Sequence, residues 1–152
     1  MKCLFVKPPF AGYIVDGIKL IEYRTRKIYI RGRIGIIESG TGTIIGDVEI
    51  VDCRFDSTFQ LYEWYLDNPR RFATPVPFEH KQGAMVWIDL DIDLKDQKTA
   101  PGLSDDEWNN AVCAYDKDLK KFLVERRKSK GHKWTTPKNS CSTPRSRFPR
   151  GT

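Results

Sequence analysis

Three side chains that can move protons or bind anions stand close together near the start of the chain. The segment from Gly17 to Arg24 reads G-x-K-x-x-E-x-R and contains Lys19, Glu22 and Arg24. Lys19 can hold a phosphate or a base carbonyl by its charge, and it can act as a general base only if burial lowers its pKa. Glu22 can accept hydrogen bonds from an exocyclic amine or activate a water, and Arg24 can bind phosphate through two parallel donors. An ion network that only braces the fold is the structural alternative for the same spacing.

Basic residues extend this motif on both sides. From Lys2 to Arg33 the chain holds eight basic residues and two acidic ones. Such an excess predicts a positive face that meets anions, and the phosphates of a nucleic acid belong to this class. Besides Lys19 and Arg24, the basic residues that we expect to contact nucleic acid are Lys7, Arg26, Arg31 and Arg33.

Aromatic side chains can add a surface on which bases stack. Trp87 is the best candidate, because its neighbours on one face of an expected strand are Asp89 and Asp91. Most other aromatic residues stand at core spacing, and we expect them to pack inside the protein.

The N-terminal elements must bring the three motif residues together. Residues 3–6 predict a short buried strand, and the two prolines before Phe10 open a helix that Gly17 ends. The alternation from Ile21 to Arg24 predicts a strand whose two charged side chains share one face.

The remaining chain predicts further strands, one short helix and one long helix. Three segments have the pattern of strands: 33–38, 43–55 and 84–92. Gly46 marks a bulge or kink. Residues 57–67 carry apolar side chains at helical spacing behind Ser57, an N-cap, and the prolines that follow mark a loop. Residues 104–127 predict a long amphipathic helix that opens with a capping box, so the fold class is α+β on a curved or closed sheet.

The positive charge is concentrated at the C-terminal end. The chain has 152 residues and a net charge of +6. From Arg126 to Thr152 there are nine basic residues and no acidic one, whereas the remainder holds 17 basic and 20 acidic residues. We therefore expect one domain over residues 1–127, and over residues 128–152 a disordered Pro-, Ser- and Thr-rich tail that can tether phosphate backbones or acidic surfaces.

Composition argues against several classes of protein. No apolar run reaches the roughly 18 residues of a transmembrane helix, and the apolar N-terminus is too short for a signal peptide. We therefore expect a cytoplasmic protein without membrane contact. The four cysteines and two histidines show no zinc-ligand spacing, so we expect neither a metal nor a cofactor.

Taken together, the motif and its surroundings resemble the ASCH domain, a member of the PUA-like β-barrel superfamily. The resemblance covers residues 2–93 and depends on where G-x-K-x-x-E-x-R stands: after a proline-opened helix and before two β segments, 31–39 and 46–53, with the tryptophan strand of 85–88 later. It implies a small barrel flanked by short helices, with a cleft beside the motif. It also places Ser39 where this residue can line the cleft.

The resemblance implies contact with RNA as well. ASCH proteins look like RNA-associated proteins, and some are hydrolases. One subgroup is an acetylcytidine amidohydrolase that uses a Lys, a Thr and a Glu, and another has been described as a ribonuclease. In the amidohydrolase the Thr stands three residues after the Lys. Here Lys19 matches, but Glu22 occupies the position of the Thr.

Three functions follow, in order of preference. The first is a binding module for RNA or a modified nucleotide. The second is a small hydrolase of a nucleoside or RNA, in which Lys19 and Glu22 are catalytic. The third is a protein-interaction domain with a basic docking tail. The missing Thr favours the binding module over the hydrolase. The sequence does not determine the oligomeric state.

Overall fold

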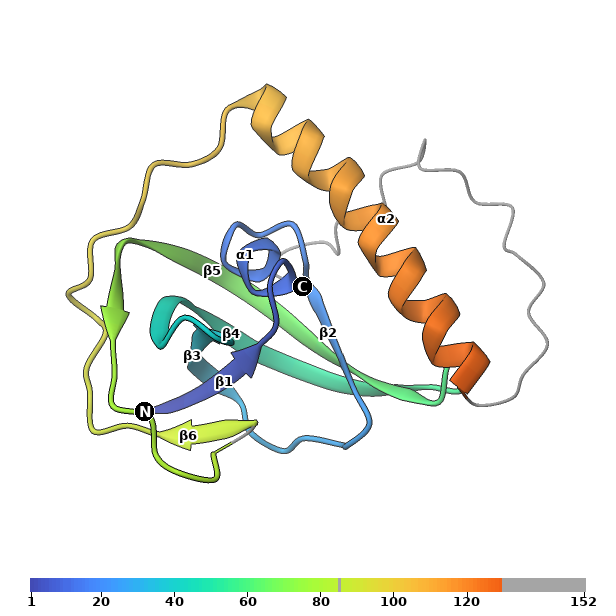
Figure 1. The fold of residues 1–152 in the computed structure, drawn as a ribbon, viewed down its shortest axis with the longest axis horizontal. Coiled ribbons are helices and arrows are strands. Elements are labelled where there is room, and N and C mark those ends of the chain that lie inside the picture. The colour runs from blue at the N-terminus through green and yellow to red at the C-terminus, as the bar shows by residue number, and fades with distance from the viewer. Residues whose placement is uncertain (85, 130–152) are drawn as a thin grey trace. The chain divides into compact units, whose positions relative to one another are not determined.

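The computed structural model describes residues 1–84 and 86–129 of the chain. Residues 1–104 form one compact unit, and a second unit begins at Asp105. The first unit contains a six-stranded sheet and helix α1 (Phe10–Val15), and the second contains helix α2 (Asp105–Ser129) (Figure 1).

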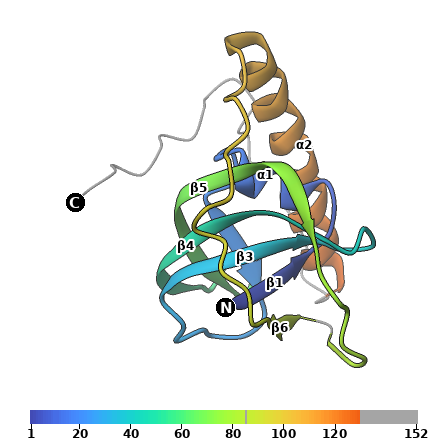
Figure 2. The ribbon, with the colours of Figure 1, turned by 90° about the vertical axis from the view of Figure 1, so that its left-hand side faces the viewer.

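The first unit is built on one mixed sheet. Its strands, in chain order, are β1 (Lys2–Val6), β2 (Ile21–Arg24), β3 (Gly32–Glu38), β4 (Thr43–Asp56), β5 (Leu61–Pro77) and β6 (Trp87–Asp89). Their order across the sheet is β2-β5-β4-β3-β1-β6. Only β1 and β3 pair in parallel, and every other neighbouring pair is antiparallel. The sheet is strongly curved in both views (Figures 1 and 2).

The closed barrel that the resemblance implied is not what the described strands form. The four-residue β2 and the three-residue β6 are the two edges of the sheet, and no ladder joins them in the described part of the chain. Side chains nevertheless connect the two ends. Arg24 Nη2 on β2 donates to the Phe5 carbonyl on β1 at 2.9 Å, and the rings of Trp64 on β5 and Trp87 on β6 stack 6.0 Å apart. The sheet therefore curls until its ends meet through side chains.

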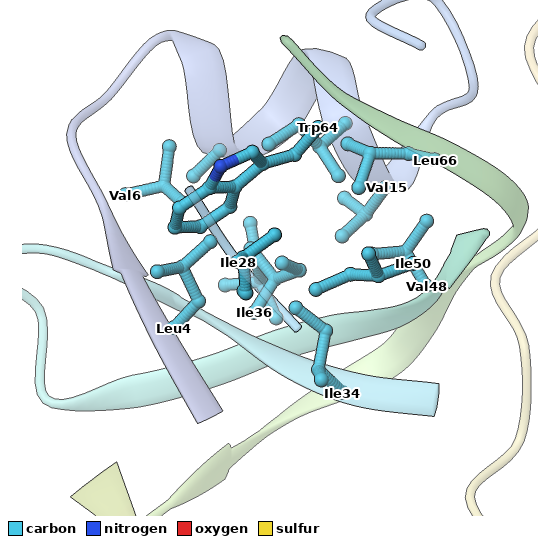
Figure 3. Close-up of a cluster of buried hydrophobic side chains, with 13 residues drawn as sticks. Leu4, Val6, Val15, Ile28, Ile34, Ile36, Val48, Ile50, Trp64 and Leu66 are labelled. Atoms are coloured by element: carbon cyan, nitrogen blue, oxygen red, sulfur yellow. The ribbon is translucent and has the colours of Figure 1, made fainter. Parts of the chain in front are cut away.

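Both faces of the curved sheet are covered. Successive residues of a strand point to opposite faces, so Leu4 and Val6 face the cluster that contains helix α1, while Cys3 and Phe5 face a second cluster. We call the first group the α1 cluster; Figure 3 shows its side chains. A Cβ at Gly46 would lie 2.6 Å from Val15 Cγ1, so glycine lets α1 pack closely on β4. The pairing of β4 also shifts register at this point, as predicted.

Residues 57–67 do not form the predicted helix, because Leu61–Pro77 is one long strand, β5. Every second residue of this strand packs into the α1 cluster: Tyr62, Trp64 and Leu66. The segment therefore has the period of two of a strand as well as apolar residues at helical spacing, and the helical spacing led to the wrong prediction. The prolines predicted to mark a loop also lie in β5. Strand β2 pairs with β5 only from Tyr62 to Tyr65. Beyond that stretch, this side of β5 has no β2 partner that needs a backbone N–H donor, so prolines, which lack this donor, are tolerated.

The remaining elements differ in how well the sequence predicted them. Helix α2 is continuous, with three acidic residues in its first turn and three basic residues in its last turn, as the helix dipole favours. The strand predicted over 84–92 is limited to Trp87–Asp89. Residues 130–152 of the predicted tail lie outside the described residues. Neither helix of the described chain is long and apolar enough to cross a membrane.

Candidate functional site

The G-x-K-x-x-E-x-R segment begins just after helix α1 and runs to the end of strand β2. Gly17 follows the helix with a φ of +80°, a conformation that glycine adopts without strain. The backbone N–H groups of Ile18 and Lys19 then donate to the Tyr13 carbonyl, at 2.9 and 3.0 Å. This turn fixes Lys19 next to the start of β2.

Glu22 holds the two cations of the motif together. Its Oε1 lies 3.5 Å from Lys19 Nζ, and its Oε2 lies 3.2 Å from Arg24 Nη2. The backbone N–H of Tyr23 also donates to Oε1, at 3.1 Å. Glu22 and Arg24 therefore lie on one face of β2, as the alternation predicted. We call Lys19, Glu22 and Arg24 the motif cluster.

Burial separates the three members of the motif cluster. The side chain of Lys19 is only 3% exposed and that of Glu22 is nearly as buried, whereas Arg24 keeps 26% of its side chain exposed. Arg24 is therefore the member that solvent reaches most easily. Because it also donates to the Phe5 carbonyl of β1, it connects the cluster to the opposite end of the sheet.

Aromatic rings surround the cations of the motif cluster. Lys19 Nζ lies 5.2 Å from the ring centroids of both Phe10 and Tyr23, and the guanidinium of Arg24 lies 5.8 Å from the Trp64 ring. The negative faces of such rings stabilise cations in a poorly hydrated place. These rings compensate part of the cost of burying Lys19.

Burial lowers the pKa of Lys19 below its ordinary value, because the charged form loses its hydration. The negative charge of Glu22 and its hydrogen bond to Lys19 oppose this shift, and the charge of Arg24 adds to it. The neutral amine is therefore more accessible for Lys19 than for a lysine in water. A lysine with a lowered pKa beside a carboxylate is typical of functional sites, although structural ion networks produce it too.

Trp87 lies close to the motif cluster and is partly buried. Its ring stacks on Trp64 with an angle of 20° between the planes, and it packs against the α1 cluster. Trp64 in turn donates from its Nε1 to the Arg26 carbonyl at 3.0 Å. Trp64 therefore lies against Arg24, and Trp87 supports Trp64 from strand β6.

The structure separates Arg33 from the motif cluster. Its neighbour Ile34 points into the α1 cluster, so Arg33 points to the opposite face of the sheet. There it binds Asp47 at 2.6 Å and Glu49 at 3.2 Å. This alternation shows that Arg33 and Arg24 do not form one continuous contact surface.

The other predicted contact residues lie outside the motif cluster. Arg26 and Arg31 are exposed in the loop between β2 and β3, and Lys7 is exposed just after β1. Ser39 follows β3, where its backbone N–H donates to the Val6 carbonyl at 2.9 Å. Among the described residues, no group of three or more His, Cys, Asp or Glu side chains is placed to hold a metal ion.

Sequence reasoning missed two features near the site. The Phe5 carbonyl that accepts from Arg24 is a main-chain group, so no residue type could have indicated it. Lys27 and Tyr29 in the loop after β2 were not singled out either. Their signal was available, because the residues from Tyr23 to Ile37 include five basic side chains and no acidic one.

The chain belongs to the ASCH domain family, whose family model matches residues 4–113. The match begins in β1 and ends within α2, so it reaches further than the motifs that suggested residues 2–93. The mixed sheet with its accompanying helices is consistent with this family.

Two solved structures of mutant ZmASCH proteins from Zymomonas mobilis resemble this chain at low sequence identity. The first has a TM-score of 0.47 and 14% identity, and the alignment covers 73% of this chain and 95% of the other. The second has a TM-score of 0.46 and 15% identity, with coverages of 73% and 93%. No curated protein matches the chain.

Proposed function

We propose that this protein is a cytoplasmic nucleic-acid-binding domain that takes RNA or a modified nucleotide at the motif cluster. The observation that carries the proposal is the arrangement of Glu22 between Lys19 and Arg24. A carboxylate flanked by two cations offers an acceptor for an exocyclic amine next to donors for a carbonyl or a phosphate, and these are the groups that base edges and backbones present.

The charge around the motif cluster supports the same function. Arg24, the most exposed member, is followed by Arg26, Lys27 and Arg31, and the stretch 24–31 holds no acidic residue. Positive segments attract phosphates at long range and release counterions when they bind. The resemblance to RNA-associated ASCH proteins adds weight to RNA over other polyanions.

A second candidate function is hydrolysis of a nucleoside or RNA, and one observation favours it. The lowered pKa of the buried Lys19 makes its neutral amine more available, and a general base needs that form. Against it stands Glu22 in place of the hydroxyl nucleophile that the amidohydrolase resemblance requires. Lys19 and Glu22 are the catalytic residues in this alternative.

Replacing Lys19 by arginine should distinguish binding from hydrolysis. Arginine keeps the positive charge and its donors but cannot supply a neutral amine near pH 7. We expect wild-type protein to bind RNA without releasing acetate from acetylated cytidine, and Lys19→Arg to keep most of the affinity. Fluorescence anisotropy with labelled RNA and an acetate-release assay measure the two properties.

Lys19→Ala serves as the matched variant, because it should weaken binding under either function. Thermal melts of all three proteins are needed, since Lys19 is buried and arginine is larger. Robust wild-type turnover that disappears in a folded Lys19→Arg variant with preserved affinity would contradict the binding function and establish the hydrolase.

Removing the basic tail should flatten the salt dependence of RNA binding. Truncation after Ser129, at the end of α2, removes six basic residues and no acidic one. Each neutralised phosphate contributes about 0.7 to the salt slope on single strands, so the slope should fall by up to about 4. Titrations at several salt concentrations measure it. An unchanged salt slope for RNA binding would rule out the tail as a tether for RNA. If truncation weakens binding to an acidic protein and leaves RNA binding unchanged, the protein-interaction alternative is favoured.

A further inference from the structure

The loop between β2 and β3, residues 25–31, is attached to the domain at two points and stiffened by hydrogen bonds of its own, although it pairs with no strand in the described chain. Ile28 is buried in the α1 cluster, where Figure 3 shows it among the core side chains. The Arg26 carbonyl accepts from Trp64 Nε1 at 3.0 Å. Arg31 Nη1 donates to the carbonyls of Ile28 and Ile30, at 3.1 and 2.9 Å. These contacts fix the path of the loop before any ligand arrives.

The same anchoring directs Tyr29 into solvent. Its side chain is 80% exposed, next to the buried Ile28 on one side and the part-buried Ile30 on the other. Lys27 Nζ lies 5.2 Å from the Tyr29 ring centroid, so a cation accompanies the exposed ring. An aromatic ring held outward on a fixed loop can stack on a base at low cost in conformational entropy.

The charges of the loop are available to a ligand. Neither Arg26 nor Lys27 forms an ion pair within the described residues, and both are exposed. Asp52 feels the charge of Arg31, but its ion pair is with Arg54, at 2.9 Å. The loop therefore keeps a net positive charge around an exposed ring.

We infer that residues 25–31 form a second contact site for single-stranded RNA, in which Tyr29 stacks on a base and Arg26 and Lys27 bind the flanking phosphates. The inference rests on the proposed function and extends it, because the loop lies outside the motif cluster. An exposed ring with cations beside it is the combination by which proteins bind single strands without reading their sequence. In double-stranded RNA the base faces are stacked inside the helix, so Tyr29 could not stack on them.

The test measures binding of a fluorescein-labelled, twelve-nucleotide single-stranded RNA of mixed sequence. Tyr29→Ala should weaken binding about tenfold, in the range of one base–aromatic stack, while Tyr29→Phe should stay within about twofold of wild type. The double variant Arg26→Gln with Lys27→Gln should weaken binding and lower the salt slope by about 1.4, the sum for two phosphates on a single strand. Phe55→Ala is the matched control, because Phe55 is a half-exposed ring that belongs to strand β4 and not to the loop.

The outcomes separate the loop from the motif cluster. If Lys19→Ala weakens RNA binding and Tyr29→Ala does not, the loop inference is overturned and the proposed function stands. The reverse pattern would support the loop and overturn the motif cluster as the binding site. Heparin is a polyanion without bases. If Tyr29→Ala weakens binding to heparin as much as binding to RNA, the stacking role is overturned. If the wild-type protein binds no RNA, both the loop inference and the proposed function are overturned.

Discussion

Replacing Asp47 by asparagine is expected to lower the free energy of unfolding by about 3 kcal/mol, the lower end of the range for breaking a buried ion pair. The Asp47 side chain is fully buried in β4. Its Oδ1 accepts from Arg33 at 2.6 Å and from Arg70 at 2.9 Å, and its Oδ2 accepts from Arg70 at 2.6 Å. Asparagine keeps the shape but removes the charge that both arginines face.

Partial exposure of the two arginines limits the expected loss. About a quarter of each side chain reaches solvent, and Arg33 keeps Glu49 as a second partner. Urea unfolding followed by circular dichroism measures the change. Asp52→Asn is the matched control on the same strand, because its pair with Arg54 is largely exposed and should contribute little. Equal stability of the two variants would show that the Asp47 network does not brace the sheet.

Replacing Glu22 by glutamine should cost about 3 kcal/mol of stability at pH 7, because it leaves Lys19 buried without its counter-charge. The pKa of Lys19 is already lowered by burial, and loss of the Glu22 charge lowers it further. Between the lowered pKa and the ordinary lysine value of about 10.4, the unfolded chain binds more protons than the folded chain. Stability contributed through Lys19 therefore rises with pH across that window.

The pH dependence makes this prediction specific to Lys19. The gap in stability between wild type and Glu22→Gln should narrow as the pH rises above 7, because the folded variant loses the Lys19 proton at a lower pH than the folded wild type, while the unfolded chains titrate alike. Urea titrations at several pH values measure the gap. The double variant Lys19→Met with Glu22→Gln should lose this pH dependence. A gap that stays constant with pH would assign the cost to Arg24 and to the Tyr23 N–H, which also contact Glu22.

The two ion networks of the sheet therefore have different expected roles. The Asp47 network joins three strands on the face that carries Arg33, and its effect is on stability. The motif cluster lies on the other face, beside α1 and the stacked tryptophans, and its effect is on stability and on ligand binding together. Measuring RNA affinity for Asp47→Asn alongside Glu22→Gln separates these roles.

The sequence by itself determined the local elements and the family. Helix α1 after the two prolines, the turn at Gly17, strand β2 and helix α2 were all predicted, because each depends on neighbouring residues. A strand places alternate side chains on one face, so Glu22 and Arg24 had to lie together. The order of these features around G-x-K-x-x-E-x-R was enough to suggest the ASCH family, which the family match confirms.

Only the tertiary structure decided which residues meet and how deeply they are buried. Residues 61–77 became strand β5 because long-range pairing with β4 outweighs the helical spacing of the segment. The pleat of β3 sent Arg33 to the face opposite Arg24, and the curl of the open sheet brought Trp87 onto Trp64 and Arg24 onto the Phe5 carbonyl. The burial that lowers the pKa of Lys19, like the exposure of Tyr29, is a property of the packed protein, and no window of sequence contains it.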